Sequence, residues 1–136
     1  MSIIQWSEEL SVGIQSIDKQ HQILIQLINS LNTAMAKGEA NITIAEILAS
    51  LTDYTRLHFS YEESLLEDYG YAESKNHALQ HRNLIKQIDL LKERFETDQS
   101  GSIGIEIMQF LKNWLTNHIM KTDKAYSEFL IRKGVV

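Results

Sequence analysis

All five histidines of this chain occupy positions where the helical pattern predicts a buried face. His58 and Glu62 continue a series of apolar residues spaced alternately by four and three, and the other histidines stand in similar series. A single histidine on such a face is usually a structural residue with a hydrogen-bonding neighbour. Several in one core are different, because burying a polar group without a partner costs about 1–3 kcal/mol. A metal would use all of them as ligands, so the pattern predicts a metal site formed by His21, His58, Glu62, His77, His81 and His118.

The spacing within and between helices predicts that these side chains meet. His58 and Glu62 are separated by four residues, as are His77 and His81, so each pair shares one helix face. A helix rises about 1.5 Å per residue, and the polar positions lie at matching distances from the predicted turns. Asp123 follows His118 by five residues, which places the two about 140° apart on an ideal α-helix. For Asp123 to join the site, the last helix must contain a π-type bulge, a feature often found at functional sites.

The number of ligands predicts two ions rather than one. Five imidazoles and two carboxylates exceed what a single ion binds. If both carboxylates and an oxide or hydroxide bridge two octahedral ions, a single coordination position stays open on one of them. The chain has no cysteine, which excludes thiolate ligands, disulfides and thiol catalysis. Mixed imidazole and carboxylate ligation favours iron, while zinc and manganese stay open as alternatives.

The elements that must position these ligands are long helices. The chain contains no proline, and glycines that are expected to end or flank helices follow its long periodic stretches at Gly38, Gly70, Gly101 and Gly134. Short loops between long helices favour antiparallel neighbours. We therefore expect one all-α domain over residues 1–136, an up-down-up-down four-helix bundle with helices at about 18–37, 43–69, 74–97 and 103–132.

The sequence also predicts how the chain enters the first two helices. Residues 1–17 are expected to form an arm that Trp6 anchors against the bundle. Asp18 is the predicted N-cap of the first helix. Thr43 and Glu46 have the spacing of a capping box for the second.

Composition narrows the classes of function. With 13 basic and 18 acidic residues, the net charge is −5, which disfavours a nucleic-acid partner because phosphate backbones bind basic surfaces. No apolar run approaches the roughly 20 residues of a membrane span. The first residues carry no basic leader, so we expect a cytoplasmic protein rather than a secreted one.

Taken together, these residues form a recognisable pattern. The chain resembles the hemerythrin family, in its single-domain bacterial form, over essentially its full length. Its matching pieces are Trp6, Asp18-x-Gln20-His21, His58-Phe59-x-x-Glu62-Glu63, His77-x-x-x-His81 and Trp114-Leu115-x-x-His118-Ile119-x-x-x-Asp123. An isolated pair of histidines four apart would be a weak signal, whereas seven ligands in this order and spacing are highly specific.

The resemblance implies an oxygen-binding bundle with two iron ions bridged by oxide or hydroxide. It assigns one iron to His77, His81 and His118, the other to His21 and His58, and both bridging carboxylates to Glu62 and Asp123. The open position then belongs to the second iron and would take dioxygen.

An apolar, dry pocket is expected beside that open position. Its candidate lining residues, which by spacing are also ordinary core residues, are Leu24, Ile25, Phe59, Trp114, Leu115 and Ile119. Of these, the resemblance assigns Leu115 and Ile119 to the control of oxygen entry. Glu63 is interpreted as a surface residue or an outer support of the site, and Tyr126 as a support or a packing residue.

Reversible binding of dioxygen for storage or delivery is the function we expect, without enzymatic activity and with an oxygen-consuming enzyme as a recipient. A sensor of oxygen, nitric oxide or redox state is an alternative, as is a peroxidase-like di-iron enzyme. A ferritin-like di-iron oxidase is disfavoured, because no histidine here has a glutamate three residues before it. A purely structural bundle without metal would leave the ligand pattern unexplained. We expect a monomer, since no helix shows an extra apolar face.

Overall fold

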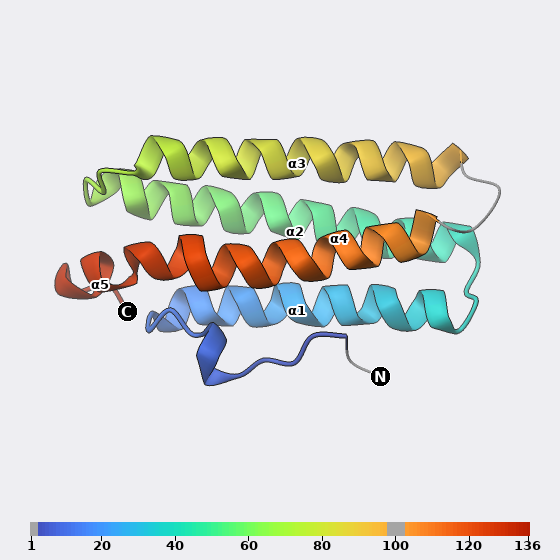
Figure 1. The fold of residues 1–136 in the computed structure, drawn as a ribbon, viewed down its shortest axis with the longest axis horizontal. Coiled ribbons are helices and arrows are strands. Elements are labelled where there is room, and N and C mark those ends of the chain that lie inside the picture. Colours follow the sequence, from blue (N-terminus) through green and yellow to red (C-terminus); the bar gives the residue numbers. More distant parts are fainter. Residues whose placement is uncertain (1–2, 98–102) are drawn as a thin grey trace.

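The computed structural model describes residues 3–97 and 103–136, and it shows long helices packed side by side as a bundle (Figure 1). The main helices are α1 (Gln15–Ala36), α2 (Asn41–Asp68), α3 (Ser74–Thr97) and α4 (Ile103–Asn117). Helix α4 continues through the π-helical segment η2 (His118–Asp123) into α5 (Lys124–Arg132). We call this continuous helical stretch, and each of α1, α2 and α3, a rod of the bundle. No strand occurs in the described ranges, so the predicted all-α four-helix bundle is confirmed.

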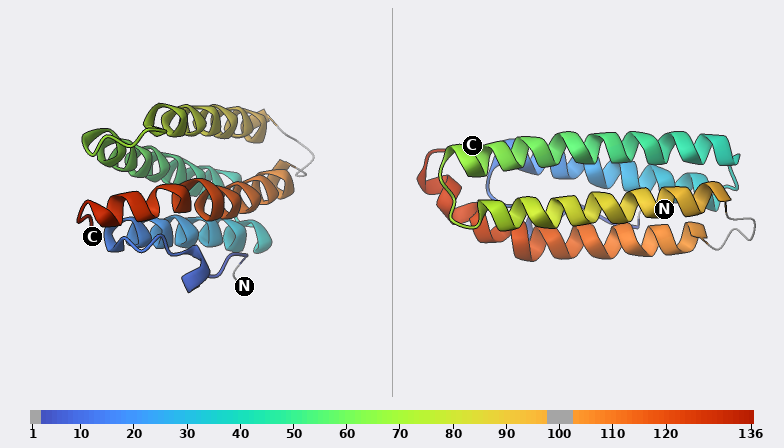
Figure 2. Two further views of the ribbon diagram at one scale, coloured as in Figure 1. Left: turned by 60° about the vertical axis from the view of Figure 1, so that its left-hand side comes forward. Right: turned by 90° about the horizontal axis from the view of Figure 1, so that it is seen from above.

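Each rod of the bundle packs against two neighbours. Helix α1 contacts α2 and α4, and α3 contacts the same two helices, which closes the bundle around a shared interior. Both further views show the rods aligned along one long axis (Figure 2). Among the described residues, no helix is long and apolar enough to cross a membrane.

Glycines end two of these helices as the sequence predicted. Gly38 and Gly70 have φ values of 68° and 71°, a left-handed conformation that costs glycine little. In each case, the amide of the following residue donates to a helix carbonyl: Glu39 to Ala34 and Tyr71 to Leu66. This pattern satisfies carbonyls that the last turn would leave free. Gly101 lies outside the described residues.

The starts of the first two helices differ from the prediction. Helix α1 begins at Gln15, and Asp18 therefore lies inside its first turn. Its carboxylate accepts hydrogen bonds from the Ser11 hydroxyl at 2.5 Å and the Val12 amide at 2.9 Å, so it fastens the arm instead of capping the helix. Helix α2 begins at Asn41 without a side-chain cap, and the predicted capping box at Thr43 is wrong.

The N-terminal arm lies along the bundle and includes the short 3₁₀ helix η1 (Glu8–Leu10). Trp6 is only partly buried against the core, whereas Ile4 and Leu10 are buried. Asn29 of α1 adds polar contacts, since its side-chain oxygen accepts from the Ile4 amide at 3.1 Å and its nitrogen donates to the Ile4 carbonyl at 2.8 Å. Trp6 is thus one of several anchors.

The interior contains two apolar clusters with a polar layer between them. In α1, Ile17 belongs to one cluster and Leu24 to the other, with buried His21 between them. The same order recurs in α2, where Glu62 lies between Phe59 and Leu66. This polar layer lies near the end of the bundle where α2 is joined to α3.

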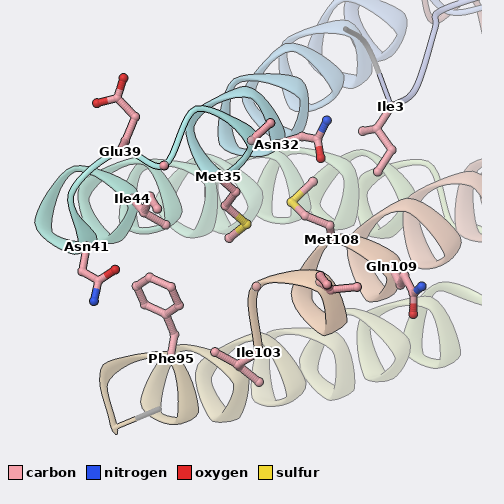
Figure 3. Close-up of a pocket in the computed structure, with 14 residues that line it drawn as sticks. Ile3, Asn32, Met35, Glu39, Asn41, Ile44, Phe95, Ile103, Met108 and Gln109 are labelled. Atoms are coloured by element: carbon pink, nitrogen blue, oxygen red, sulfur yellow. The ribbon is translucent and has the colours of Figure 1, made fainter. Parts of the chain in front are cut away.

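A cavity of about 760 Å³ lies at the opposite end of the bundle (Figure 3). Met35, Phe95 and Met108 are among its lining residues, and it contains none of the predicted metal ligands. This cavity is therefore separate from the polar layer.

Candidate metal centre

The polar layer contains all seven predicted ligands, and every one of them is buried. Both carboxylates are completely buried, at 0 % exposure. All four rods contribute: α1 supplies His21, α2 supplies His58 and Glu62, α3 supplies His77 and His81, and η2 supplies His118 and Asp123. The structure thus brings together residues that are up to 102 positions apart in the chain.

Three histidines surround one side of the two carboxylates. Oε1 of Glu62 lies 2.5 Å from Nε2 of His77 and 3.1 Å from Nε2 of His81. Oδ1 of Asp123 lies 2.9 Å from Nε2 of His118 and 3.2 Å from that of His77. These five residues could hold one metal ion, because their ligand atoms all lie within 4.8 Å of one another.

The second oxygen of each carboxylate faces the other two histidines. Oε2 of Glu62 lies 3.2 Å from Nε2 of His58 and 3.8 Å from Nε2 of His21. Oδ2 of Asp123 lies 3.1 Å from the same His21 nitrogen. Each carboxylate therefore presents one oxygen to a three-histidine group and one to a two-histidine group, which is the arrangement of two bridging ligands.

Several of these buried atoms have no hydrogen bond. Within the described part of the chain, neither ring nitrogen of His21 and neither carboxylate oxygen of Asp123 has a hydrogen-bond partner. Such groups are costly in a protein interior unless something else binds them. Their donor atoms fit a pair of metal ions, since imidazole nitrogen and carboxylate oxygen are ordinary ligands of iron, zinc and manganese.

The π-helical segment explains how Asp123 reaches the site. His118 and Asp123 mark its two ends, and both side chains are buried. A π-helix has more residues per turn than an α-helix, so side chains five apart come back to nearly the same face. The predicted bulge is confirmed.

Charge in the layer is balanced between carboxylates and histidines. Burial alone would raise the pKa of Glu62 and Asp123, but the surrounding histidines hold both well below their usual values, Glu62 through hydrogen bonds and Asp123 chiefly through the charge of nearby His118. Burial opposes the charged form of His21 and His77, yet the two carboxylates outweigh it and raise the pKa of each to about 9. Without metal, protonated imidazoles therefore stabilise the buried carboxylates.

Three residues outside the ligand set hold the ligands in place. Tyr126, fully buried, donates its hydroxyl to Oε2 of Glu62 at 2.9 Å, so it supports the site as well as packing. Nδ1 of His81 lies 3.0 Å from a Glu63 carboxylate oxygen, and Nδ1 of His58 lies 2.6 Å from the Gln20 side-chain oxygen. Gln20 entered the sequence analysis only as part of the piece Asp18-x-Gln20-His21, and its spacing alone did not indicate a contact with His58.

The six apolar residues expected near the open position differ in burial and in which histidines they contact. Five are buried: Leu24, Ile25, Phe59, Leu115 and Ile119. Trp114 is partly buried and stacks on His118, with ring centroids 4.9 Å apart. Phe59 stacks on His81 at 3.7 Å, so these two aromatic rings lie against the three-histidine group.

Comparison with known proteins agrees with this geometry. The family model described as the hemerythrin HHE cation binding domain matches residues 12–130. A protein named bacteriohemerythrin from Pseudomonas aeruginosa is 37% identical over 126 residues, covering 93% of this chain and 80% of its own. One of the same name from Methylococcus capsulatus is 29% identical, covering 96% of this chain and 98% of its own.

A solved structure shows the same fold. The crystal structure of a wild-type hemerythrin superposes with a TM-score of 0.83 at 28% identity, covering 93% of this chain and 97% of its own. The hemerythrin family binds iron and dioxygen. With the family model matching most of its length and the ligand groups brought together in its core, this chain belongs to the hemerythrin family.

Proposed function

We propose that the protein binds dioxygen reversibly at two iron ions bridged by oxide or hydroxide, and that it stores or delivers oxygen. The observation that carries this proposal is the division of the carboxylate oxygens. Glu62 and Asp123 each turn one oxygen to the three-histidine group and one to the two-histidine group. Such a division suits two neighbouring ions, whereas a single ion would leave part of the layer unused.

The unequal number of histidines supports a binding position on one side. Three histidines and two carboxylate oxygens surround one metal position, while two histidines and two carboxylate oxygens surround the other. With a shared bridge, the second position has one protein ligand fewer. Iron in this position would supply electrons to bound dioxygen, and we assign the dioxygen to this side.

The surrounding side chains would keep water out of that position. Leu24, Leu115 and Ile119 are at most 2 % exposed and lie in the apolar cluster next to the layer. A dry environment strengthens electrostatic contacts inside the site and limits loss of charged products to water. The protein's own part in the reaction is therefore to fix the ligands, balance their charge and exclude solvent.

The test combines metal analysis with visible spectroscopy. We expect two iron ions per chain and a charge-transfer band that appears when the anaerobically reduced protein meets air and disappears when oxygen is removed. A band that does not reverse would favour a redox sensor or a peroxidase-like enzyme instead. A colourless protein without iron would overturn the proposal.

A matched pair of variants tests the ligand assignment. Asp123→Asn should lose one or both irons, because an amide is a poor bridge between two ions. Asp68→Asn makes the same chemical change at an exposed position at the end of α2 and should retain full iron content. Equal iron content in the two variants would remove Asp123 from the ligand set.

A further inference from the structure

Two of the predicted ligands are held from behind by side chains of different charge. Nδ1 of His81 faces the carboxylate of Glu63 at 3.0 Å, whereas Nδ1 of His58 faces the amide oxygen of Gln20 at 2.6 Å. His81 belongs to the three-histidine group and His58 to the two-histidine group. The two halves of the centre therefore differ beyond their number of histidines.

Both contacts fix the orientation of an imidazole ring. A carboxylate or amide oxygen can only accept, so Nδ1–H of each histidine is the donor. The lone pair of Nε2 is then available on the opposite side of the ring. Nε2 of His81 lies 3.1 Å from Oε1 of Glu62, and Nε2 of His58 lies 3.2 Å from Oε2 of the same residue. Each outer contact thus directs its Nε2 towards the shared carboxylate.

We propose that Glu63 and Gln20 are positioning residues that make the two metal positions unequal in binding strength. This inference rests on the proposed metal centre. A hydrogen bond to an anion draws the Nδ1 proton away from the ring and makes Nε2 a stronger metal ligand. A hydrogen bond to a neutral amide strengthens Nε2 less. Glu63 accordingly strengthens the three-histidine position, and Gln20 mainly orients His58 in the two-histidine position.

The surroundings of Glu63 set the size of the effect. Its side chain is 34 % exposed and lines a cleft of about 350 Å³ between α2 and α3 that reaches His81. Arg56, at the same cleft, pairs with Asp89 at 3.0 Å, and among the described residues the basic group within ion-pair distance of Glu63 is His81 itself. The Glu63 charge therefore acts on His81, although solvent screens part of it.

Because solvent screens part of the Glu63 charge, we expect its removal to lower metal affinity by an amount near the lower end of the usual range for residues that support metal ligands. Their removal typically lowers metal affinity by about ten- to a hundredfold. We expect roughly tenfold for Glu63→Ala in one of the two binding steps, and a smaller loss for Glu63→Gln, which keeps an acceptor without the charge. Gln20→Ala should lower the affinity of the other binding step, in which the two-histidine position is filled.

The experiment is a titration of the metal-free protein with Co²⁺ in competition with a chelator, alongside nitrogen NMR of the histidine rings before metal is added. Glu67→Gln is the control, because Glu67 is an exposed carboxylate of the same helix, one turn further along. We expect it to bind Co²⁺ like the wild type. In the NMR spectra, Glu63→Ala should change the ring nitrogen signals of His81 and leave those of His58 unchanged.

A wrong metal centre and a wrong positioning role would give different results. If wild-type protein does not bind two equivalents of Co²⁺, the proposed metal centre is wrong. If it binds two and both Glu63 variants bind as tightly as Glu67→Gln, the positioning role of Glu63 is wrong. An unchanged His81 signal in Glu63→Ala would contradict it independently of metal.

Discussion

At the residue scale, the central feature is a set of polar groups that are buried without enough partners. His21 and Asp123 lack hydrogen bonds in the described structure, and neither is exposed by more than 1 %. Evolution rarely retains such groups in a core for stability alone, because an apolar replacement would serve better. Their donor atoms point to a function that requires them, and metal binding is the one their chemistry supports.

The raised pKa values lead to a prediction about metal uptake. His21 and His77 have pKa values of about 9 without metal, so both imidazoles are positively charged at pH 7, with a proton on each ring nitrogen. A metal ion binds only the unprotonated ring nitrogen, so it must displace these protons. We therefore expect Zn²⁺ affinity to rise from pH 6 to pH 9 and binding at pH 7 to release protons. Titration in weak buffer with a pH indicator measures the release, and binding without proton release would contradict the predicted protonation.

A second residue-scale prediction concerns Leu115. This side chain is buried in the apolar cluster, three residues before His118. Leu115→Ala should open space for water beside the centre and speed conversion of the oxygenated protein to its oxidised form, with iron content unchanged. The truncation should also cost about 2–4 kcal/mol of stability. The decay of the oxygen-dependent band measures the rate.

Leu111→Ala provides the control for this change. Leu111 is equally buried in the same helix and cluster, one turn further from His118. It should lose similar stability without faster oxidation. If both variants oxidise at the wild-type rate, Leu115 has no part in protecting the centre.

At the element scale, the sequence predicted some features of the helices better than others. The third helix was predicted at the residues where α3 occurs, and the bulge between His118 and Asp123 followed from their spacing. Both predictions rest on periodicity, which reports which face of a helix is buried. The helix starts were harder to predict. Asp18 is a residue type that often caps helices, but here its carboxylate binds the N-terminal arm. A local pattern does not show which neighbour a carboxylate will choose.

The π-helical segment itself is testable. Deleting Met120, which is 44 % exposed within η2, should allow the last rod to become a regular α-helix. Because π-bulges cost stability and persist mainly for function, the metal-free variant should be at least as stable as the wild type. The deletion leaves the His118 and Asp123 side chains four positions apart, the spacing at which two residues of an α-helix share one face. Asp123 should therefore still reach the site, and we expect the variant to keep its metal affinity.

Circular dichroism and Co²⁺ titration would measure these two effects together. Deleting Lys133, an exposed residue after the last helix, is the matched control and should change neither quantity. A Met120 deletion that binds Co²⁺ much more weakly than the wild type would show that the bulge does more than bring Asp123 to the face of His118.

At the scale of the whole molecule, the predicted ligands meet because all four rods reach the same level of the bundle. The sequence indicated this through equal distances of the histidines from the turns, and the structure places the layer between two apolar clusters. The sequence left open whether Glu63 is a surface residue or an outer support, and it assigned no role to Gln20. Their outer contacts depend on how neighbouring helices are rotated against each other. Periodicity gives the face of each helix but not the partners that side chains meet across an interface.

The buried layer also makes the stability of the whole bundle depend on pH in a characteristic way. A group whose pKa is raised on folding contributes stability below its unfolded value and loses that contribution as pH rises through its folded value. His21 and His77 rise from 6.5 to about 9, so the metal-free protein should become less stable between pH 6.5 and 9. Glu62 and Asp123 have lowered pKa values, so their contribution is present above their usual values of 4.5 and 3.8 and is lost in acid. His58 acts in the opposite direction, because burial lowers its pKa, and its contribution to stability is lost as pH falls below 6.5. The metal-free protein should therefore be most stable at about pH 6.5.

Bound metal should oppose the loss of stability that the metal-free protein is expected to show between pH 6.5 and 9. Bound ions need unprotonated imidazoles, so their stabilisation of the folded state grows with pH over the range where the metal-free protein weakens. Thermal unfolding of the metal-free and Zn²⁺-loaded protein at pH 6 and pH 9 tests this. We expect the midpoint of the metal-free protein to be lower at pH 9 and the gap between the two forms to be wider there. A metal-free protein that is equally stable at both values would mean that the carboxylates do not hold the protons of His21 and His77, and that the charge balance of the layer rests on other groups.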